Sequence, residues 1–127
     1  MLGLRQAGAL DVTDDVVRSS TALAGGVGET REMCGAVLAG IQAIGLRYGR
    51  VDRSVSRQPA IDRAAALVDG FRAHFSTLAC GALVRPFPDM ASRARKERCA
   101  RIVAFVADWL EAGLDDLLPG APGPRGE

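Results

Sequence analysis

Apolar residues recur at helical spacing along most of this 127-residue chain. In residues 33–46 the only strongly polar side chain is Gln42. A helix that is apolar around most of its circumference belongs in the middle of a bundle. We therefore expect a central helix that follows the glycine-rich turn at residues 25–28, has Thr30 as its N-cap and ends near Tyr48-Gly49.

Three further segments show amphipathic helical patterns. The first is Asp11–Leu23, capped by Asp11 or Thr13, and the second runs from Pro59 to about Thr77. The third is capped by Asp89 or Ser92 and ends near Leu118. The apolar stripes of the last two helices are Ile61, Ala64, Ala65, Val68, Phe71, Phe75 and Leu78, and then Cys99, Ile102, Val103, Val106, Trp109, Leu110, Leu114 and Leu117.

The remaining segments show weaker patterns. Residues 1–10 carry little periodicity, a short helical turn is expected at residues 78–83, and no segment has a convincing strand pattern. The sequence thus predicts an all-α fold, a small bundle of about four main helices around the central apolar helix. We expect one helical domain over residues 1–118 and a disordered Pro/Gly tail over residues 119–127.

Small residues line one part of the expected central helix. Ala36, Ala39, Gly40 and Ala43 recur at three/four spacing. Each glycine inside a helix costs roughly 1 kcal/mol. We therefore expect that neighbouring helices approach the central helix closely here.

Composition excludes several classes of function. Lys and Arg number 16 and Asp and Glu 15, so the net charge of +1 gives no sign of nucleic-acid binding. The uncharged run of about 14 residues is shorter than the roughly 20 that a membrane span needs. The chain has 3 cysteines, no secretory signal pattern and no phosphate-binding or haem motif. These features predict a soluble, cytoplasmic protein of bacterial type.

The three cysteines, Cys34, Cys80 and Cys99, are the candidate chemical groups. Cys34 is expected in the first turns of the central helix, where free N–H groups and the helix dipole lower a thiol pKa from about 8.5. Burial in an apolar core would instead raise the pKa of Cys34 and leave the thiol inert. Both alternatives are open at this point.

Two other features have a structural and a functional interpretation. His74, the single histidine, lies beside an apolar stripe and is expected to pack or cap a helix rather than bind a ligand. The basic residues at the start of the last helix are expected to form a solvated face. Their alternative role is to bind an anionic partner or a thiolate at Cys99; they are Arg93, Arg95, Lys96, Arg98 and Arg101.

The order of these motifs resembles a known family. A glycine turn precedes GETREMCGA, a small-residue helix ends in GLRYG, a helix with Phe71 and Phe75 is followed by Cys80, and Cys99 opens the last helix. This order is similar to that of the C_GCAxxG_C_C family of putative redox-active proteins, which are small bacterial and archaeal helical proteins often encoded near transporter genes. The similarity extends over about residues 10–118.

The resemblance implies roles for the three cysteines. Cys34 matches the cysteine of the family's CGAxxG motif, and Cys80 and Cys99 match its last two cysteines. The motif's final glycine falls at Ala39, with a glycine at Gly40 instead. The first family cysteine has no counterpart, so either translation begins upstream of Met1 or this member lacks that helix.

Two functional hypotheses follow. In the first, Cys34, Cys80 and Cys99 carry thiol/disulfide chemistry, or bind an iron–sulfur cluster or zinc with a fourth ligand from elsewhere, for which His74 is the only nearby imidazole. Cys34 is then the expected low-pKa thiol and Cys80 its most accessible partner, and the protein's own partner is a redox or transporter-associated protein. In the second, the chain is a helical interaction module, possibly a homodimer, with structural cysteines.

Overall fold

The computed structural model describes residues 1–117 except residues 9 and 90, and describes side chains as far as residue 112. Over these residues the chain is all-α, as predicted, with six α-helices and one 3₁₀ turn. These elements are α1 (Leu2–Gln6), α2 (Asp14–Ser19), η1 (Thr21–Leu23), α3 (Gly35–Tyr48), α4 (Gln58–Phe75), α5 (Cys80–Leu83) and α6 (Arg93–Leu117). The expected tail at 119–127, and Leu118, lie outside the described residues, as do the side chains of Leu114 and Leu117.

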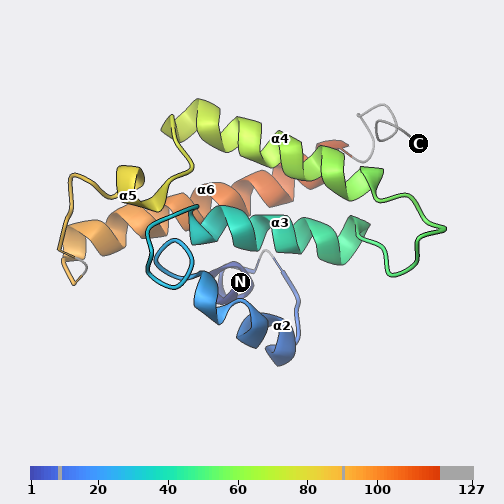
Figure 1. Ribbon diagram of the computed structural model, residues 1–127, viewed down its shortest axis with the longest axis horizontal. Coiled ribbons are helices and arrows are strands. Elements are labelled where there is room, and N and C mark those ends of the chain that lie inside the picture. The colour runs from blue at the N-terminus through green and yellow to red at the C-terminus, as the bar shows by residue number, and fades with distance from the viewer. Residues whose placement is uncertain (9, 90, 118–127) are drawn as a thin grey trace.

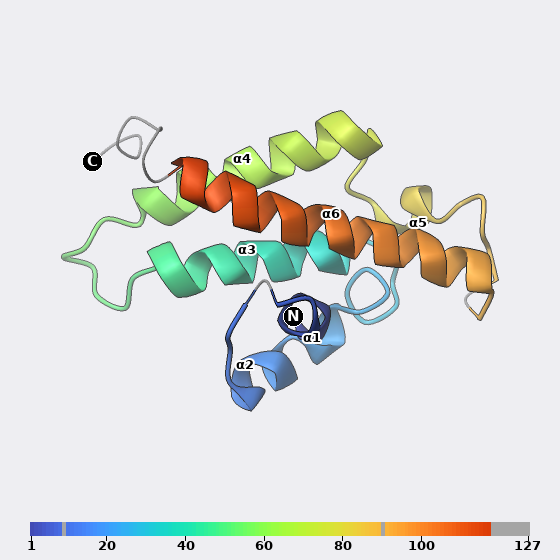
Figure 2. The same cartoon turned by 180° about the vertical axis from the view of Figure 1, so that it is seen from behind.

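The three long helices form the body of the molecule (Figure 1). α4 runs back antiparallel to α3, and α6 contacts both of them. Seen from the front and from behind, α1 and α2 lie on the side of α3 and α6 away from α4 (Figure 2). None of the helices in the described part of the chain combines the length and the apolar character that crossing a membrane requires.

One hydrophobic core joins these helices. Val37 and Ile44 of α3, Leu67 and Phe71 of α4 and Val106 of α6 have no exposed surface. Burying a side chain of this size completely contributes about 1.5–3 kcal/mol. The core therefore explains why α3, α4 and α6 pack as one unit.

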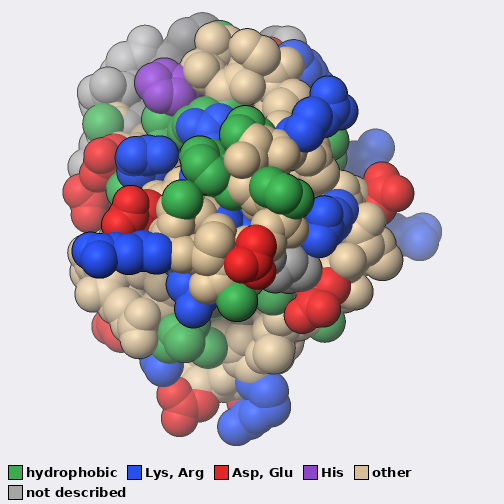
Figure 3. Space-filling view, turned by 90° about the vertical axis from the view of Figure 1, so that its left-hand side faces the viewer, with side chains coloured by type: hydrophobic (Ala, Val, Ile, Leu, Met, Phe, Trp, Pro, Cys, Tyr) green, Lys and Arg blue, Asp and Glu red, His purple; other side chains and the backbone are tan. Residues whose placement is uncertain are grey.

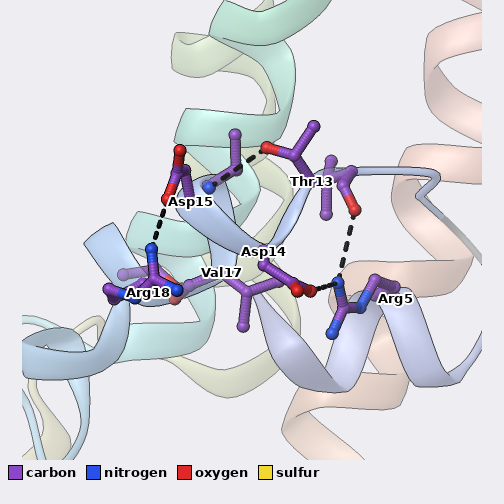
Figure 4. A network of polar contacts seen from close by, with 9 residues as sticks. Arg5, Thr13, Asp14, Asp15, Val17 and Arg18 are labelled. Carbon is purple, nitrogen blue, oxygen red and sulfur yellow. Dashed lines mark hydrogen bonds and ion pairs between the residues drawn. The ribbon is translucent and has the colours of Figure 1, made fainter.

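The helix α1 was not predicted from the sequence. It has only five residues, too few to be stable alone or to show periodicity. Its stability comes from tertiary packing: Leu4 is buried, and a Cβ on Gly3 would lie 3.2 Å from Cγ1 of Val103 on α6. Arg5 then ties α1 to the next segment by donating to Oδ1 of Asp14 at 2.9 Å (Figure 4).

The helix α4 buries the predicted stripe only in part: Phe71 is fully buried as predicted, and Val68 and Phe75 pack against the core. Ile61, expected in its apolar stripe, is 47% exposed, whereas Leu67 is fully buried. Arg63 is also buried, and its guanidinium lies 4.0 Å from the centroid of the Tyr48 ring. A cation over an aromatic face is stabilised, and the arginine stem covers apolar surface. The buried side of α4 therefore includes Leu67 and Arg63, neither of which belongs to the predicted apolar stripe.

Local signals located most other helix ends. Thr13 caps α2 by accepting a hydrogen bond from the Val16 N–H, and Ser92 Oγ accepts from the Arg95 N–H at the start of α6. Gly49 ends α3 and Pro59 lies in the first turn of α4. Thr30, however, is not the N-cap of α3; that position is occupied by Cys34, and the Thr30 hydroxyl donates to the carbonyls of Gly26 and Val27.

Gly40 is where α3 approaches its two neighbours most closely. A Cβ on Gly40 would lie 2.7 Å from Leu67 of α4 and 2.9 Å from Val106 of α6. The glycine displaced by one position from the family motif thus has a packing role, while Ala39 is buried beside it.

Replacing Gly40 by valine should lower the free energy of unfolding by about 1–3 kcal/mol, because the added groups overpack the contact with Leu67 and Val106. Gly45→Val is the matched control, since a Cβ on Gly45 meets no atom within 4 Å. Urea denaturation measures both. Equal losses in the two variants would show that helix propensity, not packing, decides the effect.

Candidate functional site

The turn before α3 is left-handed. Backbone φ is positive at Gly25, Gly26, Val27, Gly28 and Glu29, with values from 59° to 74°. Left-handed backbone costs an L-residue roughly 1–2 kcal/mol, and a β-branched residue such as Val27 adopts it rarely. The turn is held by hydrogen bonds from the N–H groups of the following residues 31 and 32 to the carbonyls of Gly25 and Gly26, both at 2.9 Å.

A single antiparallel bridge pairs Met33 with Ala79. The Cys34 N–H donates to the Leu78 carbonyl at 2.8 Å, and the Cys80 N–H donates to the Glu32 carbonyl at 2.6 Å. Cys34 and Cys80 each follow a paired residue, so their side chains leave the bridge on the same side. Such diagonal neighbours lie about 7–8 Å apart.

Each of the three cysteines lies at or near the N-terminal end of a different helix. Cys34 is the N-cap of α3, Cys80 is the first residue of α5, and Cys99 lies in the second turn of α6. All three thiols are free; Cys34 and Cys80 are buried and Cys99 is partly exposed.

The three cysteines line one cavity of about 540 Å³. The lining residues come from α1, from α2, η1 and the turn that follows them as far as residue 26, and from α3, α5 and α6. Most of the lining is apolar; it includes Leu4, Leu23, Leu83, Val84, Ile102 and Val103. The fold therefore brings together three thiols that are far apart in the sequence.

Glycine is required where the turn meets Cys80. A Cβ on Gly26 would lie 2.6 Å from the Cβ of Cys80 and 2.8 Å from the Cα of Arg31. Gly35 is similarly close to a backbone carbonyl, since its Cβ would lie 2.4 Å from the oxygen of Leu23. These contacts seat the turn against α5 and the start of α3.

Burial controls the acidity of Cys34. Desolvation raises the pKa of this thiol above its ordinary value, and the N–H groups of Val37 and Ala36 lower it with less effect. Negative charge at Cys80 or Cys99 also raises the pKa of Cys34. The thiol is therefore protonated at neutral pH.

These findings correct two expectations. Cys34 is at a helix N-terminus as expected, but it is not the low-pKa thiol, because its desolvation outweighs the N–H groups of the first turn. Cys80 is not the accessible partner, because α5 and the adjoining turn bury it; Cys99 is the most exposed of the three.

His74 is not part of this cavity. Its ring is exposed and stacks on Phe105, with centroids 4.6 Å apart, which is the packing role expected from the sequence. Among the described side chains, residues 1–112 apart from 9 and 90, no three His, Cys, Asp or Glu residues are grouped so as to hold a metal ion.

The basic start of α6 is only partly a solvated face. Lys and Arg side chains are spread over this end of the molecule, with Asp and Glu among them (Figure 3). Arg98, however, donates to the Leu83 carbonyl at 3.3 Å and lies over the Phe75 ring. Arg95 is buried and lines the cavity. The burial of Arg95 could have been predicted from the sequence, because this residue lies on the same helical stripe as Cys99, Ile102 and Val106. Its charge led us to place it on the solvated face instead.

A family model described as putative redox-active protein (C_GCAxxG_C_C) matches residues 4–112. The chain belongs to this family. The resemblance noted from the order of the motifs is thereby confirmed. No curated protein and no solved structure matches this chain. The family match covers all three cysteines and the whole described cavity lining from Leu4 onward.

Alkylation of Cys34 should reach its half-maximal rate at a pH above the ordinary thiol pKa, since burial disfavours the thiolate. Site-resolved mass spectrometry of iodoacetamide labelling as a function of pH measures this. In urea, where the burial is lost, the half-maximal pH of Cys34 should fall to the ordinary thiol value. A half-maximal pH for Cys34 below the ordinary value in the folded protein would contradict the burial argument.

The same shift makes stability depend on pH. Because the folded chain favours the neutral thiol, the contribution of Cys34 to the free energy of unfolding is fully present below the ordinary thiol pKa. It is lost as the pH rises through the raised pKa of the folded state.

Gly26→Ala should destabilise the fold more than Gly28→Ala. Both glycines have positive φ, but a Cβ on Gly28 meets no atom within 4 Å. Gly28→Ala should therefore cost about 1–2 kcal/mol, from the backbone alone. Gly26→Ala should cost a further 1–3 kcal/mol or so, from the clashes with Cys80 and with the Arg31 backbone. Urea denaturation of the two variants separates these clashes from the cost of positive φ, and equal costs would show that the turn can move to relieve them.

Proposed function

We propose that this chain is a thiol–disulfide redox protein in which two of the three cysteines Cys34, Cys80 and Cys99 form a reversible disulfide. The observation that supports it is the convergence of all three thiols on one cavity. Membership of the putative redox-active family agrees with this assignment. Three free thiols also suit a reducing compartment such as the cytoplasm.

Cys99 is the proposed attacking thiol because it is the most exposed. Its thiolate attacks one sulfur of an incoming disulfide, carried by a small molecule or a partner protein, and the other sulfur leaves as a thiolate. The product of this step is a mixed disulfide at Cys99.

Cys34 is the proposed resolving thiol. It lines the same cavity as Cys99 and Cys80, and negative charge at either of them raises the pKa of Cys34. Cys34 loses its proton to the solvent and attacks the Cys99 sulfur, and the second thiolate of the partner is released and protonated. In total, one disulfide and two cysteine thiols give two thiols and one Cys34–Cys99 disulfide.

Cys34 and Cys80 are the alternative reacting pair, in which Cys80 takes the place of Cys99. Cys80 shares a side of the Met33–Ala79 bridge with Cys34, but diagonal neighbours about 7–8 Å apart exceed the usual Cα separation of about 4.4–6.8 Å in a disulfide. A Cys34–Cys80 bond would therefore need a movement of α5.

Incubation of the reduced chain with glutathione disulfide tests the proposal. Thiol titration should fall from three free thiols to one, and peptide mapping should find a Cys34–Cys99 bond. Cys99→Ser should form a mixed disulfide much more slowly than the natural chain does. Cys34→Ser should stop at the mixed disulfide on Cys99.

Cys80→Ser is the matched control and should behave like the natural chain. Three thiols that stay free in every case would contradict the redox function and favour an interaction module with structural cysteines. A Cys34–Cys80 bond would retain the redox function but show that Cys80, not Cys99, reacts with Cys34.

A further inference from the structure

Arg95 is a buried cation without a partner for one of its terminal nitrogens. It is 4% exposed, and its Nη1 is buried and makes no hydrogen bond within the described part of the chain. A buried guanidinium left unpaired is strongly unfavourable, so such a group signals a missing ligand or a functional role. Arg95 lines the cavity that holds the three thiols.

A second charged side chain that lines the cavity is also positive. Lys96, which follows Arg95 on α6, also lines it. None of the described residues that line the cavity is an Asp or a Glu. The charge of the cavity wall is therefore positive, and no side chain of the wall neutralises it.

The start of α3 adds to this positive potential. Gly35 and Ala36, the first two residues of this 14-residue helix, line the same cavity. The N–H groups of a first helical turn have no partners within the helix and attract anions. Arg95 and the N-terminus of α3 thus supply two independent reasons for a negative group to bind.

We propose that this cavity binds a small organic anion, an apolar body with one carboxylate or phosphate head group, and that Arg95 binds the head group. The apolar lining, including Leu4, Leu83 and Ile102, accommodates the body. The cavity volume of about 540 Å³ is within the usual range of small-molecule sites. Binding requires no reaction at a thiol, so this site does not depend on the proposed redox chemistry.

Calorimetric titration with octanoate, octyl phosphate and the neutral 1-octanol tests the site. Octanoate, octyl phosphate or both should bind more tightly than octanol, and the tighter of the two identifies the head group. Arg95→Met should weaken binding of that anion at least about tenfold, because a charge-assisted hydrogen bond is lost. It should change octanol binding less than about twofold.

Arg101→Met is the matched control, since Arg101 is an exposed arginine of the same helix that does not line the cavity. It should leave all three affinities within about twofold of the natural chain. Equal affinity for octanol and both anions, or an Arg95→Met variant that binds the anions as the natural chain does, would overturn the proposal.

A second measurement uses the natural chain alone, so its outcome does not depend on whether Arg95→Met folds. A bound anion would cover Cys99, so octanoate or octyl phosphate should slow iodoacetamide labelling of Cys99 and raise the melting temperature, whereas octanol should do so less. If neither anion changes labelling or melting at millimolar concentration, the proposal is wrong. Arg95→Met itself should melt no lower than the natural chain, because it removes an unpaired buried charge.

Discussion

Two backbone hydrogen bonds across the Met33–Ala79 bridge are the constraint on which the thiol site depends. They join the start of α3 to the start of α5, and they set Cys34 and Cys80 on the same side of the paired segments. The left-handed turn before the bridge packs against Cys80. Only a glycine at position 26 allows this contact, because a Cβ there would clash with the Cβ of Cys80. The strain of Val27 and Glu29 is the cost of this approach, and strained backbone of this kind gathers at functional sites.

Much of the fold could be predicted from the sequence, because long helices carry local signals. The apolar run of α3, Gly49 at its end, Pro59 in α4 and the Ser92 cap of α6 each act within a few residues. The sequence also predicted a short helical turn at residues 78–83, where the structure has α5. These features identified the helices and their order, and the order of the cysteines indicated the family.

The chemical character of the site could not be predicted, because it depends on packing between distant segments. Whether a helix N-terminus or desolvation controls the pKa of Cys34 is decided by how deeply α1, α5 and α6 bury the thiol. Arg95 was expected on a solvated face because charge usually marks exposure, yet it lies inside the protein, as does Arg63. The five-residue α1 exists only where α6 can cover Leu4.

The contact between Gly3 and Val103 joins opposite ends of the described chain, and this has a consequence for synthesis. A ribosome adds roughly 5–20 residues per second, so the 65 residues from Cys34 to Cys99 take about 3–13 seconds to make. During that interval α6 does not yet exist, and the earlier thiols lack one wall of their enclosure. Burial protects these thiols from oxidation only after α6 has docked. Until then, a reactive disulfide can form a mixed disulfide with Cys34 or Cys80 of the nascent chain.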